Sequence, residues 1–160
     1  WVAQVTRSRG LSITFAAGIY DSRGKLERVW CNRASWGRIV GEIVAESQTN
    51  LRQRGLKTAR VVLVSNKGLV LEQLGGEEIL KTNLAEAGME AVRQITNGHS
   101  GFQIEKNPRT ATVEVNGYAA ARGFSTYKGH GWGVMISQER DEASASVRAL
   151  GYTILMTGLV

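Results

Sequence analysis

Residues 129–138 read GHGWGVMISQ, and this stretch decides the fold that we expect for the chain. Trp132, Val134 and Ile136 recur at every second position. A period of two is typical of a β-strand, because successive side chains of a strand point to opposite faces of the sheet. The glycines before it indicate a loop, so the sequence predicts a strand over 132–138 that follows a glycine-rich turn.

More strands are predicted upstream of this one. Residues 101–105 form a short apolar run, and residues 110–124 form a longer one that is rich in β-branched residues at its start. Two hairpins are expected earlier, over 11–30 and over 59–73, since each has two apolar runs around a turn that ends in glycine. The chain is therefore rich in antiparallel strands.

Helices are predicted between these strands. Apolar residues keep helical spacing over 36–54, up to Gly55, and over 77–96, up to Asn97-Gly98. A third helix is expected to begin in the acidic segment 139–150. Helices and antiparallel strands follow one another in separate blocks, which is typical of the α+β class.

The last twelve residues, 149–160, carry no charge and are mostly apolar. One interpretation is a strand or helix that packs on the core. The other is the first part of a transmembrane helix, which needs about 20 apolar residues to span a bilayer. Residues 1–3 are also apolar, and under the second interpretation they are the end of an earlier span.

The composition excludes several classes of protein. Of the 160 residues, 42% are hydrophobic and 21% are charged, which excludes a disordered chain. Twenty Lys and Arg against 14 Asp and Glu give a net charge of +6. The basic residues are dispersed and do not alternate with aromatic residues, so a nucleic-acid groove is not indicated. The excess charge favours small anions or reflects a solvated surface.

Motifs of known catalytic and metal sites are missing from the sequence. Gly98-His99-Ser100-Gly101 lacks the spacing of a hydrolase nucleophile, and the glycines of 129–133 precede a strand, unlike those of a dinucleotide loop. One cysteine, Cys31, allows no intrachain disulfide, and the two histidines have no Asp, Glu or Cys at ligand spacing. We therefore expect no enzyme activity, no metal and no cofactor.

The final third resembles the end of a Cache domain, the extracytoplasmic PAS-like sensor module of bacterial chemoreceptors and sensor kinases. The resemblance rests on Asn116-Gly117-Tyr118-Ala119, on 129–138 and on Asp141-Glu142-Ala143, in that order. In this family the returning strand often reads like GWGVVVSQ, and an acidic helix follows it into the second transmembrane span. The resemblance covers 58–150 well and 1–57 weakly.

The resemblance implies a PAS-like antiparallel sheet covered by helices, with a C-terminal helix leading toward a membrane span. It implies a single sensor domain over 1–148. Within this domain, the N-terminal hairpin and helix occupy residues 1–57. The PAS-like core occupies residues 58–138, and the exit helix occupies residues 139–148. Residues 149–160 would then begin the transmembrane helix.

The function implied by the resemblance is that of a sensor. The chain would be the periplasmic, ligand-binding domain of a bacterial transmembrane receptor of the methyl-accepting chemotaxis type. It would bind a small molecule, signal through its exit helix and perform no chemistry. Its other partners would be a second copy of itself, in a homodimer, and the cell membrane, through flanking spans. Nucleic acid is not an implied partner.

Aromatic residues beside arginines are the candidates for the ligand pocket. A guanidinium can donate two parallel hydrogen bonds to a carboxylate or another small anion. Such an anion is therefore the expected ligand. The amino-acid-binding signature of the family is not matched, so no amino acid is assigned. The predicted ligand-binding residues are Trp30, Arg33, Trp36, Tyr118, Arg122, Phe124, Tyr127 and His130.

Three alternatives remain at this point. The sensor domain can belong to a histidine kinase or a cyclase. The chain can be a structural or interaction module of a membrane protein that binds no small ligand. It can also be a soluble enzyme or a nucleic-acid-binding protein in which 149–160 pack as core.

Overall fold

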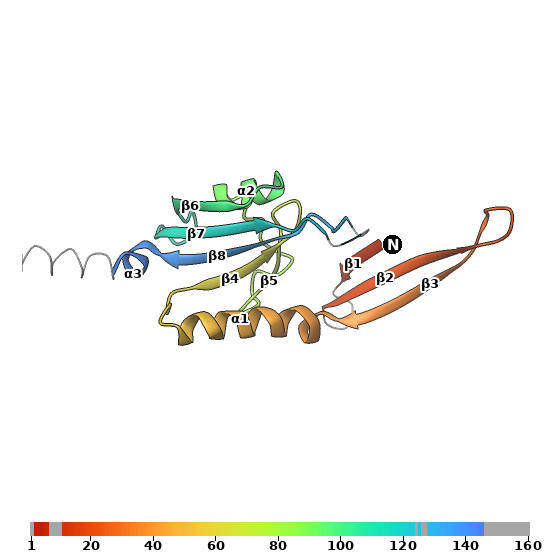
Figure 1. The fold of residues 1–160 in the computed structure, drawn as a ribbon, viewed down its shortest axis with the longest axis horizontal. Helices are drawn as coiled ribbons and strands as arrows, with labels where there is room; N and C mark the ends of the chain where they lie inside the picture. Colours follow the sequence, from red (N-terminus) through yellow and green to blue (C-terminus); the bar gives the residue numbers. More distant parts are fainter. Residues whose placement is uncertain (1, 7–10, 124, 126–127, 146–160) are drawn as a thin grey trace, which may run out of the picture. The chain divides into compact units, whose positions relative to one another are not determined.

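The strand predicted over 132–138 lies at the centre of a five-stranded antiparallel sheet (Figure 1). This strand is β8 (Gly133–Glu139), and the order across the sheet is β5-β4-β8-β7-β6. The predicted hairpin over 59–73 and the two strands after it are confirmed. Their bounds are Arg60–Val64 for β4, Val70–Gln73 for β5, Gly101–Lys106 for β6 and Val113–Ala120 for β7.

The computed structural model describes residues 2–6, 11–123, 125 and 128–145. It divides the chain into two compact units, Trp1–Ile43 and Val44–Val160, and the five-stranded sheet belongs to the second. The boundary therefore falls near the start of a helix, whereas the sequence predicts an N-terminal part of the domain that extends over 1–57. A single sensor domain over 1–148 stays a prediction.

The first unit contains a three-stranded antiparallel sheet of β1 (Val2–Thr6), β2 (Ser12–Tyr20) and β3 (Leu26–Ser35). The hairpin predicted over 11–30 is confirmed as β2 and β3. β3 continues to Ser35 because its last residues pair with the start of β2. Residues 2–6 pair with β2, so the interpretation of 1–3 as the end of a membrane helix is wrong for the described residues 2 and 3.

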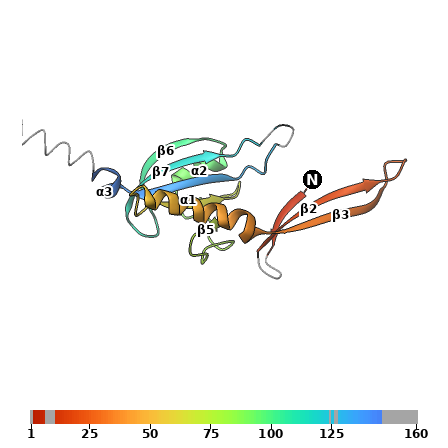
Figure 2. The same ribbon diagram turned by 60° about the horizontal axis from the view of Figure 1, so that its bottom comes forward.

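The helix predicted over 36–54 is confirmed as a π-helical turn, η1 (Gly37–Gly41), followed by α1 (Glu42–Gln53). Gly55 has a φ of 92°, the left-handed conformation that commonly ends a helix. In Figure 2, α1 and α2 lie on opposite sides of the five-stranded sheet.

The helix predicted over 77–96 is wrong over residues 77–89, since only α2 (Glu90–Thr96) is helical. The backbone of residues 80–84 pairs instead with β5 and the turn before it: the Leu80 N–H donates to Val70 O and the Leu84 N–H to Gly68 O, both at 2.9 Å. Leu80 has a φ of 57°, which a right-handed helix does not allow. The apolar residues spaced like those of a helix in this segment therefore belong to a folded loop, and their side chains enter the core.

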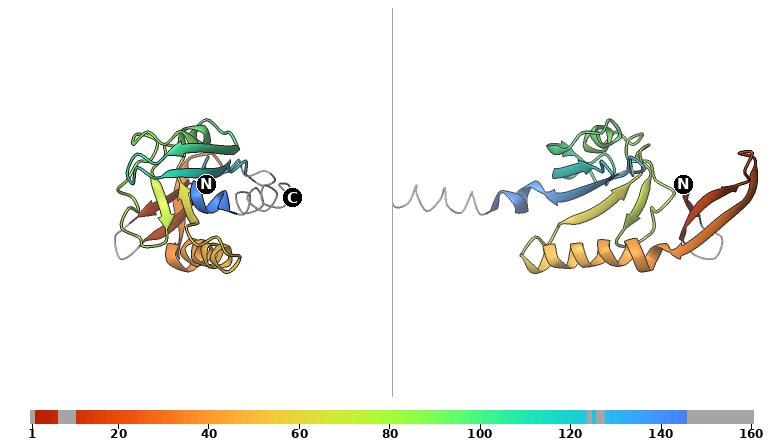
Figure 3. Two further views of the ribbon diagram at one scale, coloured as in Figure 1. Left: turned by 90° about the vertical axis from the view of Figure 1, so that its left-hand side faces the viewer. Right: turned by 45° about the vertical axis from the view of Figure 1, so that its right-hand side comes forward.

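The core of the second unit lies between the sheet and α2. Burial alternates along β8, as the strand period requires, and Val62 and Val64 of β4 belong to the same core. Figure 3 shows α2 over β6 and β7 and the twist of the sheet toward β5. The buried core residues are Val62, Val64, Val70, Leu84, Met89, Ala91, Val92, Ile95 and Met135.

A row of polar side chains crosses this same face of the sheet. The carboxylate of Glu105 accepts hydrogen bonds from the Glu90 and Ala91 N–H groups at the start of α2, at 2.7 and 3.1 Å. The Asn116 amide donates to Glu105 at 3.0 Å, and the Ser137 hydroxyl donates to Asn116 at 2.6 Å. The row therefore links the start of α2 to β8 through β6 and β7.

The third predicted helix begins where expected. α3 spans Arg140–Ala143, and the rest of 139–150, with the apolar residues 149–160, lies outside the described residues. Within the described part of the chain, no helix has both the length and the apolar character needed to cross a bilayer.

Candidate functional site

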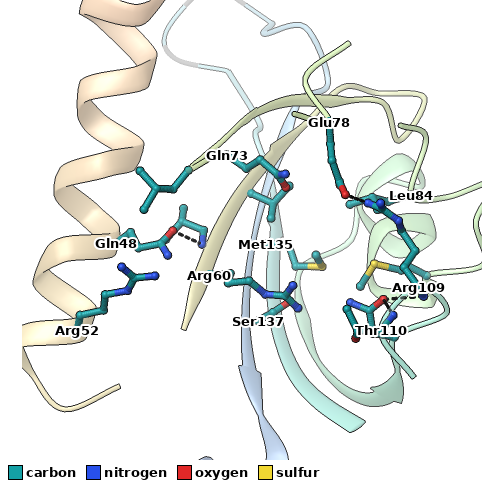
Figure 4. A pocket seen from close by; sticks show the side chains of 15 residues that line it. Gln48, Arg52, Arg60, Gln73, Glu78, Leu84, Arg109, Thr110, Met135 and Ser137 are labelled. Atoms are coloured by element: carbon teal, nitrogen blue, oxygen red, sulfur yellow. Dashed lines mark hydrogen bonds and ion pairs between the residues drawn. The ribbon is translucent and has the colours of Figure 1, made fainter. Parts of the chain in front are cut away.

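A cavity of about 380 Å³ opens beside β4 in the second unit (Figure 4). It lies where β5 ends. Gln73 is paired with Val62, and the chain then leaves the sheet at Gly75 and Gly76, whose φ angles are 98° and 66°. The β5 side of Arg60 is therefore open. The volume falls at the small end of the roughly 300–1,000 Å³ that is typical of ligand pockets.

α1 closes part of this open edge with one side chain. Gln48 is buried, its Nε2 donates to Ala59 O at 3.2 Å, and its Oε1 accepts from the Val61 N–H at 3.4 Å. The side-chain amide thus replaces a neighbouring strand, which would also supply one donor and one acceptor. This attachment places Arg52, one turn further along the same helix face, at the wall of the cavity.

Three arginines from separate elements surround the cavity. In Figure 4, Arg52 extends from α1 on one side, Arg109 lies on the other side, and Arg60 of β4 lies between them. Arg60 pairs with Glu114, and Arg109 pairs with Glu78. Within the described residues Arg52 has neither a hydrogen bond nor an ion pair, so its guanidinium is available to a ligand.

Asn107 holds two of these pairs in place. It is buried, and its Nδ2 lies 3.2 Å from both carboxylate oxygens of Glu114, which is itself buried behind Arg60. Its Oδ1 accepts from the Arg109 N–H at 2.9 Å. A single amide therefore shapes the turn between β6 and β7 that carries Arg109 and orients the carboxylate that binds Arg60.

The cavity combines a charged wall with an apolar floor. Val62, Leu84, Met89 and Met135 supply the floor. The polar lining includes Gln73, Thr110 and Ser137, besides the three arginines and Glu78. No cluster of His, Cys, Asp and Glu able to hold a metal ion occurs in the described part of the chain. The lining therefore combines charged groups, which can hydrogen-bond to a polar group, with apolar side chains that can contact a hydrocarbon group.

The start of α3 is tied to the connection between α1 and β4. The Glu142 carboxylate accepts from the backbone N–H groups of Lys57 and Thr58 at 2.7 and 2.8 Å and from the Thr58 hydroxyl. Gln138 adds a further donor at 3.2 Å. Residues 57–58 follow the helix that carries Arg52, so the segment after β8 is linked to the cavity wall through Glu142.

These donors lower the pKa of Glu142 from 4.5 to about 2, the Thr58 hydroxyl having the largest effect. Since the folded pKa lies below the ordinary one, this carboxylate stabilises the fold above about pH 4.5 and loses that contribution as the pH falls toward 2. We expect Glu142→Gln to unfold at lower urea concentration than the wild type at pH 7, and the difference to shrink as the pH falls from 4.5 to 2.5.

The measurement is urea unfolding followed by circular dichroism at pH 7, 4.5, 3.5 and 2.5. Glu139→Gln is the matched control, because Glu139 is an exposed glutamate three residues earlier. A difference between Glu142→Gln and the wild type that stays constant across these pH values would contradict the prediction.

The first three predicted ligand-binding residues lie in the first unit. Trp30 is half-exposed on β3, Arg33 donates from Nε to the Ser12 hydroxyl at 2.8 Å, and Trp36 is fully buried next to η1. The cavity of the second unit has none of them in its lining. Their role in binding stays a prediction.

The remaining predicted residues belong to the second unit. Tyr118 packs against the buried core from β7, Arg122 is exposed after the end of that strand, and the His130 ring lies 5.1 Å from the Trp132 ring. Phe124 and Tyr127 lie outside the described residues. The three described residues do not line the cavity either.

The residues that do surround the cavity were missed because they are far apart in the sequence. Arg52, Arg60 and Arg109 come from a helix, a strand and a turn, and no short motif contains two of them. The one available signal was the polar Gln48, which shares a helix face with Val44 and Leu51, since a polar residue beside such apolar neighbours needs a buried partner.

The fold is that of PAS-like, Cache-type sensor domains, as solved structures show. The chain is similar to the extracellular domain of mmHK1S-Z3, a protein assigned as a histidine kinase, with a TM-score of 0.66 and 20% identity over 92% of this chain and 53% of that one. It is similar to the periplasmic sensory domain of the Campylobacter jejuni chemoreceptor Tlp1, with a TM-score of 0.65 and 14% identity over 88% and 48%.

A third solved structure is the ligand-binding domain of the Pseudomonas aeruginosa amino-acid chemoreceptor PctB in complex with L-Arg. Its TM-score is 0.61 at 20% identity, over 94% of this chain and 53% of that one. The chain thus spans about half the length of these domains. No protein-family model and no curated protein sequence matches it. The resemblance stated from the sequence is confirmed for the fold.

Proposed function

We propose that the chain is an extracytoplasmic, small-molecule-binding sensor domain of a bacterial transmembrane signalling receptor, and that the ligand binds in the cavity beside β4. The observation that carries the proposal is the cavity itself, whose lining contains both the unpaired Arg52 and a set of apolar residues. The similar structures support it, since two of them are a sensory domain and a ligand-binding domain of chemoreceptors and another is the extracellular domain of a protein assigned as a histidine kinase. Under this proposal the domain performs no catalysis.

The signal would leave the domain through the contact at Glu142. A ligand on Arg52 favours one position of α1, and Lys57 and Thr58, which follow α1, are held by the Glu142 carboxylate. A shift of α1 therefore moves the start of α3. Such coupling requires only that the ligand binds the two positions of the helix with different affinity.

The receptor would be of the methyl-accepting chemotaxis type, anchored by flanking membrane spans and acting as a homodimer. A histidine kinase is the second candidate, because two of the similar structures are domains of proteins assigned to that class. Both candidates place this domain on the periplasmic side of the membrane.

A thermal-shift screen of residues 1–160 against small carboxylates, amino acids, inorganic anions and amines tests the proposal. A ligand that binds only the folded protein raises the melting temperature with its concentration. Any ligand found in this way is then tested with the Arg122→Ala variant. The comparison shows whether the predicted residues around Tyr118 contribute to its binding. A melting temperature that no member of the panel changes would contradict the sensor function and favour an interaction module.

A further inference from the structure

Building on the proposed function, we propose that the cavity takes a small monocarboxylate, bound by Arg52 through its carboxylate and seated on Met89 and Met135 through an apolar end. The charge of the wall, the groups that are already paired and the chemistry of the floor all favour this class of ligand. It deepens the sensor function by assigning the class of ligand and its orientation.

The charge of the wall favours an anion. Among the described residues, three arginines and one glutamate line the cavity. Glu114, behind Arg60, neutralises one further positive charge, which leaves an excess of one. A singly charged anion balances this excess of one positive charge, and a cation would be repelled by it. A dianion would keep one negative charge without a partner in a partly enclosed site.

Arg52 is the residue that can bind this anion through two parallel hydrogen bonds from its guanidinium group. Arg109 is already paired with Glu78, and Arg60 uses its Nη2 for Glu114, which leaves its Nε and Nη1 to assist. All the N–H groups of Arg52 remain available within the described structure. Guanidinium and carboxylate match as planar groups with two parallel hydrogen bonds, which favours a carboxylate over a spherical anion.

The ion pair between Glu78 and Arg109 argues against an α-amino acid as the ligand. An ammonium group needs an acceptor, and a carboxylate is the acceptor that best offsets the cost of removing its charge from water. Glu78 is the one carboxylate in the described lining, and it is engaged by Arg109. A ligand without the amino group therefore avoids an unpaired positive charge beside the arginines.

The floor suits a short hydrocarbon end. Met89 and Met135 are almost fully buried beneath the cavity, and Val62 and Leu84 lie beside them. Methionine side chains are unbranched and adaptable, so they can fit carbon skeletons of different shape. The volume of about 380 Å³ leaves room for a molecule of this kind together with bridging water.

Isothermal titration calorimetry of residues 1–160 with three probes of one carbon skeleton tests the inference. The probes are 4-methylpentanoate, L-leucine, which adds the amino group, and 3-methylbutylamine, which keeps the amine and lacks the carboxylate. We expect 4-methylpentanoate to bind more tightly than both. Arg52→Ala should weaken it roughly tenfold to a hundredfold, as the loss of a charge-assisted hydrogen-bond pair does.

The matched control is Arg54→Ala, since Arg54 is exposed two residues further on and does not line the cavity. It should bind 4-methylpentanoate like the wild type, and Arg52→Lys should fall between the wild type and Arg52→Ala. Both positions are exposed, so unchanged melting temperatures are expected to show intact folding.

Binding of 3-methylbutylamine or L-leucine in preference to 4-methylpentanoate would overturn the inference and leave the sensor function standing. Binding of 4-methylpentanoate that is equal in Arg52→Ala and the wild type would overturn the assigned anchor. If none of the three probes binds while the broad screen finds a ligand that is not a monocarboxylate, the proposed ligand class is wrong. A flat screen contradicts the sensor function itself.

Discussion

Gly133→Ala is expected to lower the free energy of unfolding by about 3 kcal/mol, near the upper end of the cost of overpacking a core. A β-carbon at this position of β8 would lie 2.2 Å from Cγ2 of Ile95 and 2.8 Å from the carbonyl oxygen of Ala119. Ile95 is almost fully buried on α2, and the Ala119 oxygen belongs to the neighbouring strand β7. Neither can move without displacing the helix or the sheet.

Urea unfolding followed by circular dichroism measures this effect. Gly117→Ala is the matched control, because Gly117 lies on β7 of the same sheet and nothing lies within 4 Å of the added carbon. It should leave stability unchanged or raise it by up to about 1 kcal/mol, the gain from replacing glycine in a strand. If the two variants have equal unfolding midpoints, the close packing of β8 against α2 is refuted.

Gln48→Met should cost about 2–4 kcal/mol. Methionine has nearly the volume of glutamine, so the change removes the two hydrogen bonds without opening a cavity. The Ala59 carbonyl and the Val61 N–H then lose the partner that Gln48 provides at the open edge of β4. A buried backbone group left without a partner costs about 1–3 kcal/mol.

The control for this variant is Gln53→Met, the same substitution at an exposed position of the same helix. It should change the free energy of unfolding by less than about 0.5 kcal/mol, as is usual for surface positions. Urea titration of both variants at pH 7 gives the comparison. Equal loss of stability at the two positions would mean that the helix tolerates methionine poorly, and that the amide of Gln48 has no special role.

The sequence alone predicted the five-stranded sheet's strands and the hairpin of β2 and β3, because each of these strands alternates or forms an apolar run between clear turn residues, whereas β1 was not predicted. In the five-stranded sheet, Val62 and Val64 face α2 while Val61 faces away, as a period of two requires. The segment 77–89 shows where this reasoning stops. Leu80 and Leu84 are four residues apart, which a helix and a folded loop satisfy equally.

The residues of the cavity could not be predicted from sequence patterns, for a different reason. The arginines that were singled out, Arg33 and Arg122, stand next to aromatic residues in the chain. The arginines of the cavity are brought together by the early end of β5, by the attachment of Gln48 and by the turn that Asn107 shapes. The turn at Asn107 is local, but the early end of β5 and the attachment of Gln48 depend on contacts between separate elements, and no short motif contains two of the three arginines.

The polar row from α2 to β8 limits how this domain can move. If β8 slid by one residue, Ile136 would take the place of Ser137 opposite Asn116, and every side chain of the strand would change faces. A piston-like displacement along the strand axis would therefore break the row at once. Under the proposed function, a motion of α3 relative to the sheet would therefore be a tilt or a rotation about the end of β8.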